Sequence, residues 1–397
     1  MHLKFKISSV LAFLFCGFYQ ASAQDFYMPP DRPPPADYDI QGEYVGTITG
    51  GSKLGAWVIS HGSMRFDVVL LPGGLLELPN DSADGGGWNR TSRFTANNIT
   101  LSGTAFTATL SGGYAVQSIT GSGSDRVLNG TFNGQAFALK HVLRKSPTQG
   151  LRPEGKSWST GYASWFDDKT ATADLSKWKK RDDDPQLKYG NYLFRGCQSS
   201  GNIATAYLHI EFKVPFVPGA SGQNRGNSGI YLRGMHEMQV LDSFGLTGAD
   251  NEVGAIYRVK APIVNACLPP LSWNTYDIWY TAGSGTNGTF TVYANGVLVQ
   301  DKSVVTVTTE AGFQGTTLYL QNHGNEVIFN NIWMIPNATL ATVTPENVIP
   351  PPPTSLFQQV PRVRKQTSYG LLELGKSLDL LGRKTIKQGH HTLTIIP

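Results

Sequence analysis

Short runs that alternate apolar and polar residues recur along most of the chain, and no long helical periodicity stands out between about residues 38 and 336. Alternation with a period of two is typical of a β-strand that buries one face. The clearest run is 207–214. One face of it carries Leu208, Ile210, Phe212 and Val214, and the other carries Tyr207, His209, Glu211 and Lys213. The pattern predicts an all-β protein.

The predicted strands fall into two groups. The first group occupies residues 38–145, with runs at 44–48, 56–59, 66–71, 105–110 and 136–139 separated by Gly, Asn and Asp, and it predicts a small β domain. The second group includes 207–214, a hairpin over 291–299 closed by Asn295-Gly296, and strands at 317–320 and 327–335. One-sided strands over about 175 residues are typical of a β-sandwich, here with one sheet facing a cleft.

Proline-rich stretches mark the expected boundaries between these parts. The expected organisation is a signal peptide (1–23), a Pro-rich linker (24–37), the small β domain (38–145), a second linker (146–160), the sandwich (161–337), and a Pro-rich linker with a basic tail (338–397).

The first residues have the features of a secretory signal. Lys4 and Lys6 precede an apolar run over 10–18, which is too short to span a bilayer, and Ala21-Ser22-Ala23 fits the small-x-small cleavage pattern. We therefore expect an exported protein (periplasmic, cell-surface or secreted) with no transmembrane segment in the mature chain. An uncleaved anchor is the alternative. The basic tail resembles the secretion tails of some exported bacterial proteins, and a disordered basic end is the alternative there.

Charge is unevenly placed along the chain. Charged residues make up 16% of the total, well below the roughly 25% of typical domains. From Pro361 onward there are seven basic and two acidic residues, so the net charge of +4 leaves the remainder close to neutral. A neutral body argues against nucleic acid as a partner and suits an uncharged substrate such as a sugar. The sequence does not indicate an oligomeric state.

The densest polar pattern lies at 227–243. It forms two short runs, Asn227-Ser228-Gly229-Ile230-Tyr231-Leu232-Arg233-Gly234 and Glu237-Met238-Gln239-Val240-Leu241-Asp242-Ser243. In a strand over the second run, Glu237 and Gln239 share one face. These two polar side chains are unfavourable on a buried strand face unless that face lines a polar cleft.

These two runs belong to a set of segments that resembles the 3-keto-disaccharide hydrolase family. The other matching segments are Gly254-Ala255-Ile256-Tyr257, Lys260-Ala261-Pro262, Val264-Asn265-Ala266, Trp273-Asn274-Thr275-Tyr276, Asn295-Gly296-Val297, Leu320-Gln321-Asn322-His323-Gly324-Asn325 and Phe329-Asn330-Asn331-Ile332-Trp333. The resemblance covers a little under half of the chain. It implies the concanavalin A-like lectin/glucanase sandwich, a jelly roll.

The resemblance also implies a substrate whose glucose ring is oxidised at C3. A C3 ketone acidifies the C2 proton, so a base can remove it and the C1 substituent can leave by elimination, with or without later hydration. We assign Glu237 as the base, with His323 and Arg233 as further catalytic groups. Gln239, Tyr257, Lys260 and Trp273 are the expected substrate-binding residues. For each of these residues a purely structural role is the alternative.

Two departures from the family pattern affect these expectations. Asn322 stands where family members commonly have an aspartate before the histidine, so a carboxylate that orients His323 is in doubt. Val253 stands where many relatives have a cysteine, so Cys267 lacks that partner, and a bond between Cys197 and Cys267 is left open. No cofactor is certain. A divalent metal ion held by Glu237, Asp242 and His323 is also left open.

Three functions fit these observations. The first is an enzyme that cleaves 3-keto-glycosides, and the second is a conventional glycoside hydrolase, which needs two carboxylates. The third is a non-catalytic carbohydrate-binding or surface module. Convergence of Glu237, Arg233 and His323 in one cleft would favour the keto-glycoside enzyme, and separate locations would argue against it.

Overall fold

The computed structural model of the chain describes Met28 and residues 33–79, 86–107, 114–151, 163–166, 178–180, 187–189, 192–306, 317–348, 377–378, 384–388 and 391–395. The expected signal peptide, most of both Pro-rich linkers and most of the tail lie outside these residues. One compact unit falls within Met1–Pro350 and a second within Pro351–Pro397.

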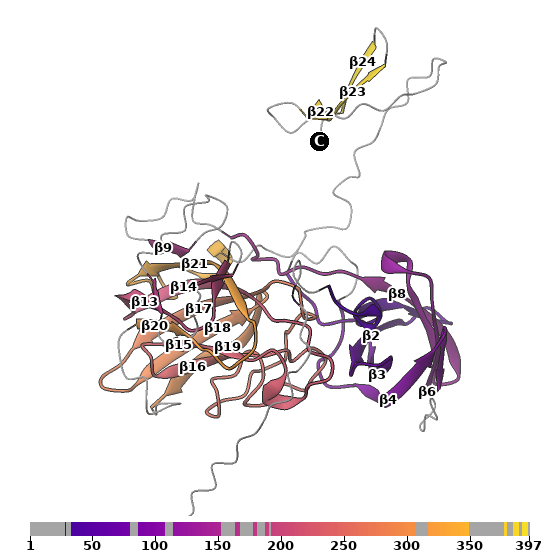
Figure 1. Cartoon of the computed structure of the whole chain (residues 1–397), viewed down its shortest axis with the longest axis horizontal. Helices are drawn as coiled ribbons and strands as arrows, with labels where there is room; N and C mark the ends of the chain where they lie inside the picture. Colours follow the sequence, from indigo (N-terminus) through magenta and orange to yellow (C-terminus); the bar gives the residue numbers. More distant parts are fainter. Residues whose placement is uncertain are drawn as a thin grey trace, which may run out of the picture. The chain divides into compact units, whose positions relative to one another are not determined.

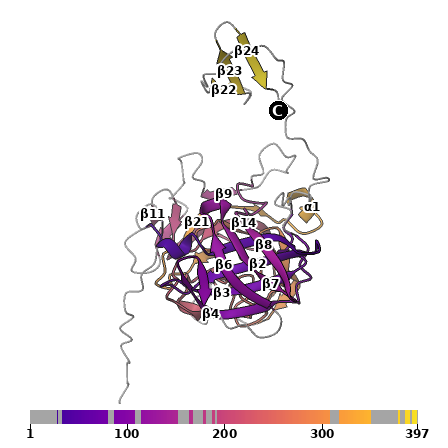
Figure 2. The same cartoon turned by 90° about the vertical axis from the view of Figure 1, so that its right-hand side faces the viewer.

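The first group of strands closes into an eight-stranded antiparallel barrel (Figures 1 and 2). Its strands are β1 (Gly42–Ile48), β2 (Lys53–Ser60), β3 (Arg65–Pro72), β4 (Phe94–Ser102), β5 (Ala105–Thr107), β6 (Tyr114–Thr120), β7 (Val127–Phe132) and β8 (Gln135–Val142). Two 3-10 turns, η1 (Ala36–Tyr38) and η2 (Gly123–Asp125), precede β1 and β7. Closure pairs β1 with both β2 and β8, so the barrel leaves no free sheet edge.

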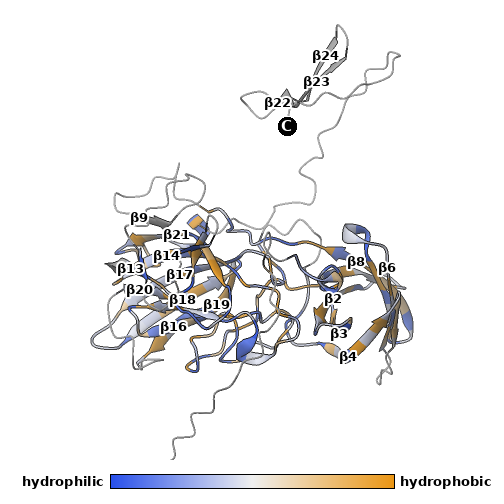
Figure 3. Cartoon of the chain, viewed as in Figure 1, coloured by the Kyte–Doolittle hydropathy of each residue, from blue (hydrophilic) through white to orange (hydrophobic). Residues whose placement is uncertain are grey.

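Strands β2 and β3 are buried on both faces, which explains why their sequences read as nearly continuous apolar runs. Leu54 and Val58 of β2 belong to the core inside the barrel. The alternate residues Trp57 and Ile59 belong to the core that the barrel shares with the second group of strands. Figure 3 shows the resulting mixture of hydrophobic and hydrophilic positions along the barrel strands.

The second group of strands forms two antiparallel sheets, which confirms the expected all-β sandwich. The small sheet has the order β10 (Trp178–Lys180), β13 (Cys197–Asn202), β20 (Thr317–Leu320), β15 (Ser228–Leu232) and β16 (His236–Val240). The large sheet has the order β11 (Lys188–Tyr189), β12 (Tyr192–Phe194), β21 (Ile328–Pro336), β14 (Ala206–Lys213), β17 (Asn274–Ala282), β18 (Gly288–Ala294) and β19 (Val297–Val305), and β9 (Ala163–Phe166) also pairs with β21.

The two sheets bury their apolar faces against each other. Leu208, Ile210 and Phe212 of β14 belong to the same core cluster as Met238 and Val240 of β16. The apolar face predicted for β14 is therefore confirmed. By alternation, Glu237 and Gln239 point to the outer face of the small sheet.

The polar face of β14 is covered rather than open to a cleft. Trp333 Nε1 donates to Leu151 O (3.1 Å), so the segment that follows the barrel lies on this face. Trp279 Nε1 donates to Val343 O (2.6 Å), which fixes the segment before the short helix α1 (Pro345–Val348) on the same face. These two segments enclose the polar face of the large sheet.

Hydrogen bonds join the barrel to the loop that follows β16. Arg93 donates from Nη2 to Gly245 O (2.6 Å) and from Nη1 to Leu246 O (3.2 Å). Arg225 donates from Nη1 to Ser60 O of the barrel (3.1 Å), and its Nε lies 2.7 Å from Asp242 Oδ2. The end of the strand that carries Glu237 and Gln239 is therefore tied to the barrel.

The second unit contains the strands β22 (Ser377–Leu378), β23 (Lys384–Gln388) and β24 (His391–Ile395). No helix among the described residues is both long and apolar enough to cross a bilayer. Cys197 and Cys267 are both buried and no disulfide joins them, which answers the question that the sequence left open.

Candidate functional site

One row of paired residues crosses the outer face of the small sheet. Its members, from strand to strand, are Lys179, Gln198, Tyr319, Tyr231 and Glu237, each paired with the next. Residues that pair directly in antiparallel strands project to the same face. The row therefore brings polar and aromatic side chains from five strands together, with Glu237 at the β16 edge of the sheet.

A chain of hydrogen bonds ends at Glu237. This residue is 2% exposed, and the Tyr231 hydroxyl donates to its Oε2 at 2.8 Å. Gln321 Nε2 in turn donates to the Tyr231 oxygen at 3.1 Å. A buried carboxylate requires such donors because burial without them is costly. The network holds the Glu237 carboxylate in one position.

Gly229 creates the space that this carboxylate occupies. It pairs with Gln239, and this pair is the neighbour of the Tyr231–Glu237 pair on the same face of the two strands. A Cβ atom on Gly229 would lie 2.1 Å from Glu237 Oε1, well inside van der Waals contact. No side chain larger than hydrogen fits there while the carboxylate keeps its place.

Three buried amide oxygens lie around this position without a donor. Gln239 is 1% exposed, and its Nε2 donates to Gln223 Oε1 (2.8 Å) and Asn251 O (3.1 Å). Nothing in the described part of the chain donates to Gln239 Oε1, Gln321 Oε1 or Asn227 Oδ1. An unsatisfied buried acceptor costs about 1–3 kcal/mol. Each of these oxygens therefore retains the capacity to accept a hydrogen bond.

A loop segment along the outer edge of β16 brings Tyr257 next to Glu237. Tyr257 N donates to Glu237 O (3.0 Å), and Gln239 N donates to Ala255 O (3.1 Å). The segment then turns back at Lys260, whose backbone N–H donates to Ile256 O. Tyr257 is half-buried beside Glu237, whereas Lys260 is exposed at the turn and pairs with Ile256, whose partner Met238 lies on the opposite face from Glu237.

Arg233 is oriented away from this set. It lies in the three-residue loop between β15 and β16 with φ of 55°, and it interacts with Tyr280 of the large sheet. His236, which alternation places on the opposite face from Glu237, also lies near Tyr280, with ring centroids 6.0 Å apart. The expected convergence of Arg233 on Glu237 is therefore not what the structure shows.

His323 is exposed in the loop after β20, two residues beyond Gln321. The neighbouring Asn322 shapes this loop, since its Oδ1 accepts from Arg195 Nε (2.8 Å) and from Gly324 N (3.0 Å). The amide at position 322 thus fixes the loop and leaves the His323 side chain at the surface.

Trp273 is also separated from the row. Its ring is 4.7 Å from Lys213 Nζ and 5.2 Å from the Tyr192 ring. Both partners belong to strands of the large sheet. The structure therefore places Trp273 in an aromatic cluster of its own.

The described residues do not fit the metal site that the sequence left open. Asp242 pairs with Arg225 and also accepts from Phe244 N (3.3 Å), so its carboxylate is engaged away from Glu237. Within the described ranges, no group of three or more His, Cys, Asp or Glu side chains is arranged to hold a metal ion.

A second buried ionic cluster lies on the covered face of the large sheet. His209 is placed between Asp277 (Nδ1 to Oδ1, 2.8 Å) and Glu211 (Nε2 to Oε1, 3.3 Å). Burial alone disfavours the charged ring, but the two carboxylates outweigh it and raise the pKa of His209 to about 9. Tyr207 also donates to Asp277 (2.7 Å), and Asn331 donates to Glu211 (2.8 Å). All these side chains are enclosed, so we interpret the cluster as structural.

Tyr231 and Gln321 are the site residues that sequence reasoning missed. Both lie in segments that carry the family resemblance, yet neither is acidic or basic, so neither stands out as a catalytic candidate. The hairpin register could have identified Tyr231. A three-residue loop joins the two strands, so residue 231 lies opposite residue 237.

Comparisons with known proteins identify a family for the part of the chain that contains the row. Residues 161–335 match the family model of the 3-keto-alpha-glucoside-1,2-lyase-like domain, and that range contains the whole row. A search of the curated proteins finds no match to the chain.

Solved structures from Parabacteroides distasonis are also similar to the chain. One, described as a putative glycosyl hydrolase, shares 32% identity, with 45% of this chain and 84% of that chain covered at a TM-score of 0.39. Another with the same description shares 17% identity, covering 50% and 99% of the two chains at a TM-score of 0.31. By the family match, residues 161–335 of the chain form a 3-keto-alpha-glucoside-1,2-lyase-like domain.

Proposed function

We propose that this protein is an enzyme that cleaves 3-keto-glycosides. The observation that carries the proposal is the buried Glu237 carboxylate, held by the Tyr231 hydroxyl beside three amide oxygens that lack donors. A fixed carboxylate next to a set of acceptors can bind a polyhydroxyl ring and remove a proton from it. The family match supports a substrate oxidised at C3.

The proposed reaction begins with transfer of the C2 proton to the Glu237 carboxylate. The electron pair of the C2–H bond forms a C2–C3 double bond, and the C3 carbonyl oxygen takes the negative charge of the enolate. As the C3 carbonyl re-forms, that electron pair makes the C1–C2 double bond, and the C1–O bond breaks with its electron pair on the aglycone oxygen. Water then adds at C1 and a proton returns to C2, which makes the net reaction a hydrolysis. Without this addition, the enzyme is a lyase.

The other groups have supporting roles in the proposal. Tyr231 and Gln321 orient the base, and the oxygens of Gln239, Gln321 and Asn227 accept from sugar hydroxyls. Lys260, on the edge segment, supplies positive charge for the enolate oxygen. His323, on the exposed loop after Gln321, donates a proton to the leaving aglycone. Arg233 and Trp273 have no direct part.

A non-catalytic carbohydrate-binding module is the second candidate. The separation of Arg233 from Glu237 favours it, because a binding module does not need those two groups to converge. The unsatisfied amide oxygens serve sugar binding equally well.

Aglycone release distinguishes the two candidates. The mature chain is incubated with a 3-keto-glucoside and with the unoxidised parent glucoside, each with and without chelator. Release from the keto compound alone supports the enzyme, and the chelator arm shows whether a divalent ion contributes. Sugar binding without release from either compound would establish the binding module.

We propose export on the basis of residues 1–23, and N-terminal sequencing of the secreted chain tests it.

A further inference from the structure

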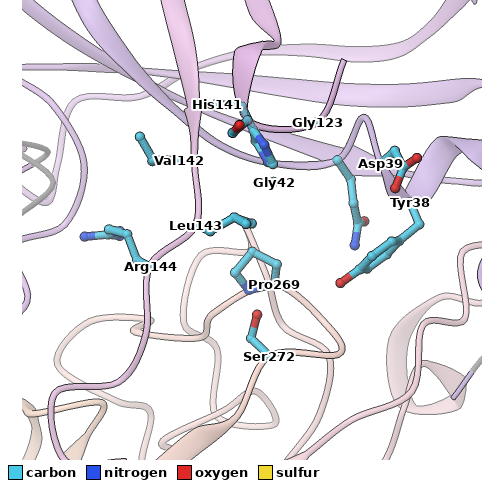
Figure 4. A pocket seen from close by; sticks show the side chains of 12 residues that line it. Tyr38, Asp39, Gly42, Gly123, His141, Val142, Leu143, Arg144, Pro269 and Ser272 are labelled. Carbon is cyan, nitrogen blue, oxygen red and sulfur yellow. The ribbon is translucent and has the colours of Figure 1, made fainter. Parts of the chain in front are cut away.

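A hollow of ≈ 230 Å³ lies where the barrel meets the loop before β17. Figure 4 shows the side chains of Tyr38, His141 and Ser272 pointing into it from different sides. The first two come from the barrel and its entry segment, and Ser272 comes from the sandwich domain. The residues of the Glu237 row do not contribute to its wall.

Two buried polar atoms of the wall lack hydrogen-bond partners. Gln41 is 3% exposed, and its Oε1 accepts from Ser60 N (3.4 Å), which leaves Nε2 for the hollow. Neither Gln41 Nε2 nor His141 Nδ1 has a partner among the described residues. Buried polar groups are nearly always satisfied in folded proteins, so an unpaired donor in a wall indicates an occupant that accepts from it.

The backbone makes room for the His141 ring. Gly42 has φ of +140°, and a Cβ on it would lie 2.5 Å from His141 Nε2. Burial, reinforced by the nearby Arg126 charge, lowers the pKa of His141. The ring also interacts with the backbone of Gly123 and Gln41, and it is neutral at pH 7.

Most of the polar groups in the wall are uncharged, and its charged members are Arg144 and the exposed Asp39. Arg144 points away from the hollow in Figure 4 and is held by Glu43, which accepts from its Nε (2.6 Å) and Nη2 (2.5 Å). Pro269 provides an apolar surface, and the exposed Leu143 side chain lies at the wall as well. Hydroxyl, amide and imidazole groups beside apolar carbon match the two kinds of surface on a sugar ring.

We propose that this hollow is a second carbohydrate site that holds one uncharged sugar ring. The Gln41 amide and the neutral His141 ring bond its hydroxyls, and Pro269 contacts its C–H face. The site does not depend on the proposed catalytic function, since it shares no residue with the Glu237 row.

Titration with methyl α-D-glucopyranoside, followed by calorimetry and saturation-transfer NMR, tests the site. We expect saturable binding with a Kd on the order of 1 mM, as suits a ligand of this size. Gln41→Glu keeps the oxygen that accepts from Ser60 N and removes the Nε2 donor, so it weakens binding at least about tenfold. Ser272→Trp fills the hollow and has the same effect, whereas Ser284→Trp, at an exposed position elsewhere, leaves binding intact.

Two further measurements check the folding of the variants and the position of the sugar. Thermal unfolding of the variants confirms that they are folded, and a crystal soaked with the sugar shows whether it lies between Gln41 and Ser272. Absence of saturable binding to the unmodified chain, binding that survives both substitutions, or water alone in the hollow would overturn the proposal. Cleavage of a 3-keto-glucoside, if present, is unchanged in Ser272→Trp, which separates this test from that of the proposed function.

Discussion

The Tyr231 hydroxyl donates a 2.8 Å hydrogen bond to Glu237 Oε2 across the β15–β16 pair. The two residues face each other in the ladder, so the bond is built into the register of the hairpin. The Tyr231 oxygen accepts a hydrogen bond from Gln321 Nε2, and its ring packs against Tyr319 with the ring centroids 5.6 Å apart. The position of the proposed base is thus set by the backbone pairing.

Replacing Tyr231 with phenylalanine removes this bond but keeps the ring and its packing. We expect kcat to fall by roughly 10- to 100-fold with little change in KM, because the carboxylate loses its fixed position while the sugar contacts remain. Steady-state kinetics on a 3-keto-glucoside provide the measurement. Tyr293→Phe, on the far side of the large sheet, is the matched control, and an equal loss in both variants would argue against the orienting role.

Gly229→Ala tests the space beside Glu237. The added methyl group would overlap Glu237 Oε1, so the carboxylate must move and activity should fall by roughly 100-fold or more. At Gly219 nothing lies within 4 Å of a built Cβ, so Gly219→Ala should keep full activity. Normal activity in Gly229→Ala would mean that the observed carboxylate position does not matter for the reaction.

The Arg225–Asp242 pair should contribute strongly to stability. Both side chains are buried, and Arg225→Leu leaves the Asp242 carboxylate without its partner, at an expected cost of about 3–5 kcal/mol in the free energy of unfolding. The double variant Arg225→Leu with Asp242→Asn should recover part of that loss. Urea unfolding measures both, with Arg258→Leu, at an exposed ion pair, as a control that changes little.

Raising the pH should weaken the fold through His209. The pKa of its ring is raised to about 9 in the folded state from 6.5, so its contribution is fully present below pH 6.5 and is lost as the pH rises through about 9. The loss is at most about 3 kcal/mol. Thermal unfolding between pH 6 and 9.5 should show the decline, and His209→Gln should flatten it. The pKa values of His141 and His236 are lowered from 6.5 by burial, so their contributions to the pH dependence lie below pH 6.5 and have the opposite sign.

Alternation along single strands predicted much of this architecture correctly. The faces of β14 and the shared face of Glu237 and Gln239 follow from a period of two. Strand β4 escaped detection because Asn97-Asn98 is typical of a turn. In the structure Asn98 adopts φ of 52° at a register shift, with its N–H bonded to Asp67.

Loops and long-range contacts account for the rest. Arg233 lies in a loop with positive φ, where strand alternation does not determine direction, and it turns toward Tyr280. Trp273 precedes β17, and only the order of the strands in the sheet reveals that its neighbours are Tyr192 and Lys213. The polar face of β14 was visible in the sequence, but its cover comes from segments far away along the chain.

The most direct test of the central claim compares Glu237→Gln with the unmodified chain in one aglycone-release assay. The amide has nearly the same shape as the carboxylate but cannot take the C2 proton. We predict release from the 3-keto-glucoside and not from its parent, and a fall in kcat of about 100- to 10,000-fold in the variant with the fold intact. Release at an undiminished rate by Glu237→Gln would contradict the assignment of Glu237 as the base.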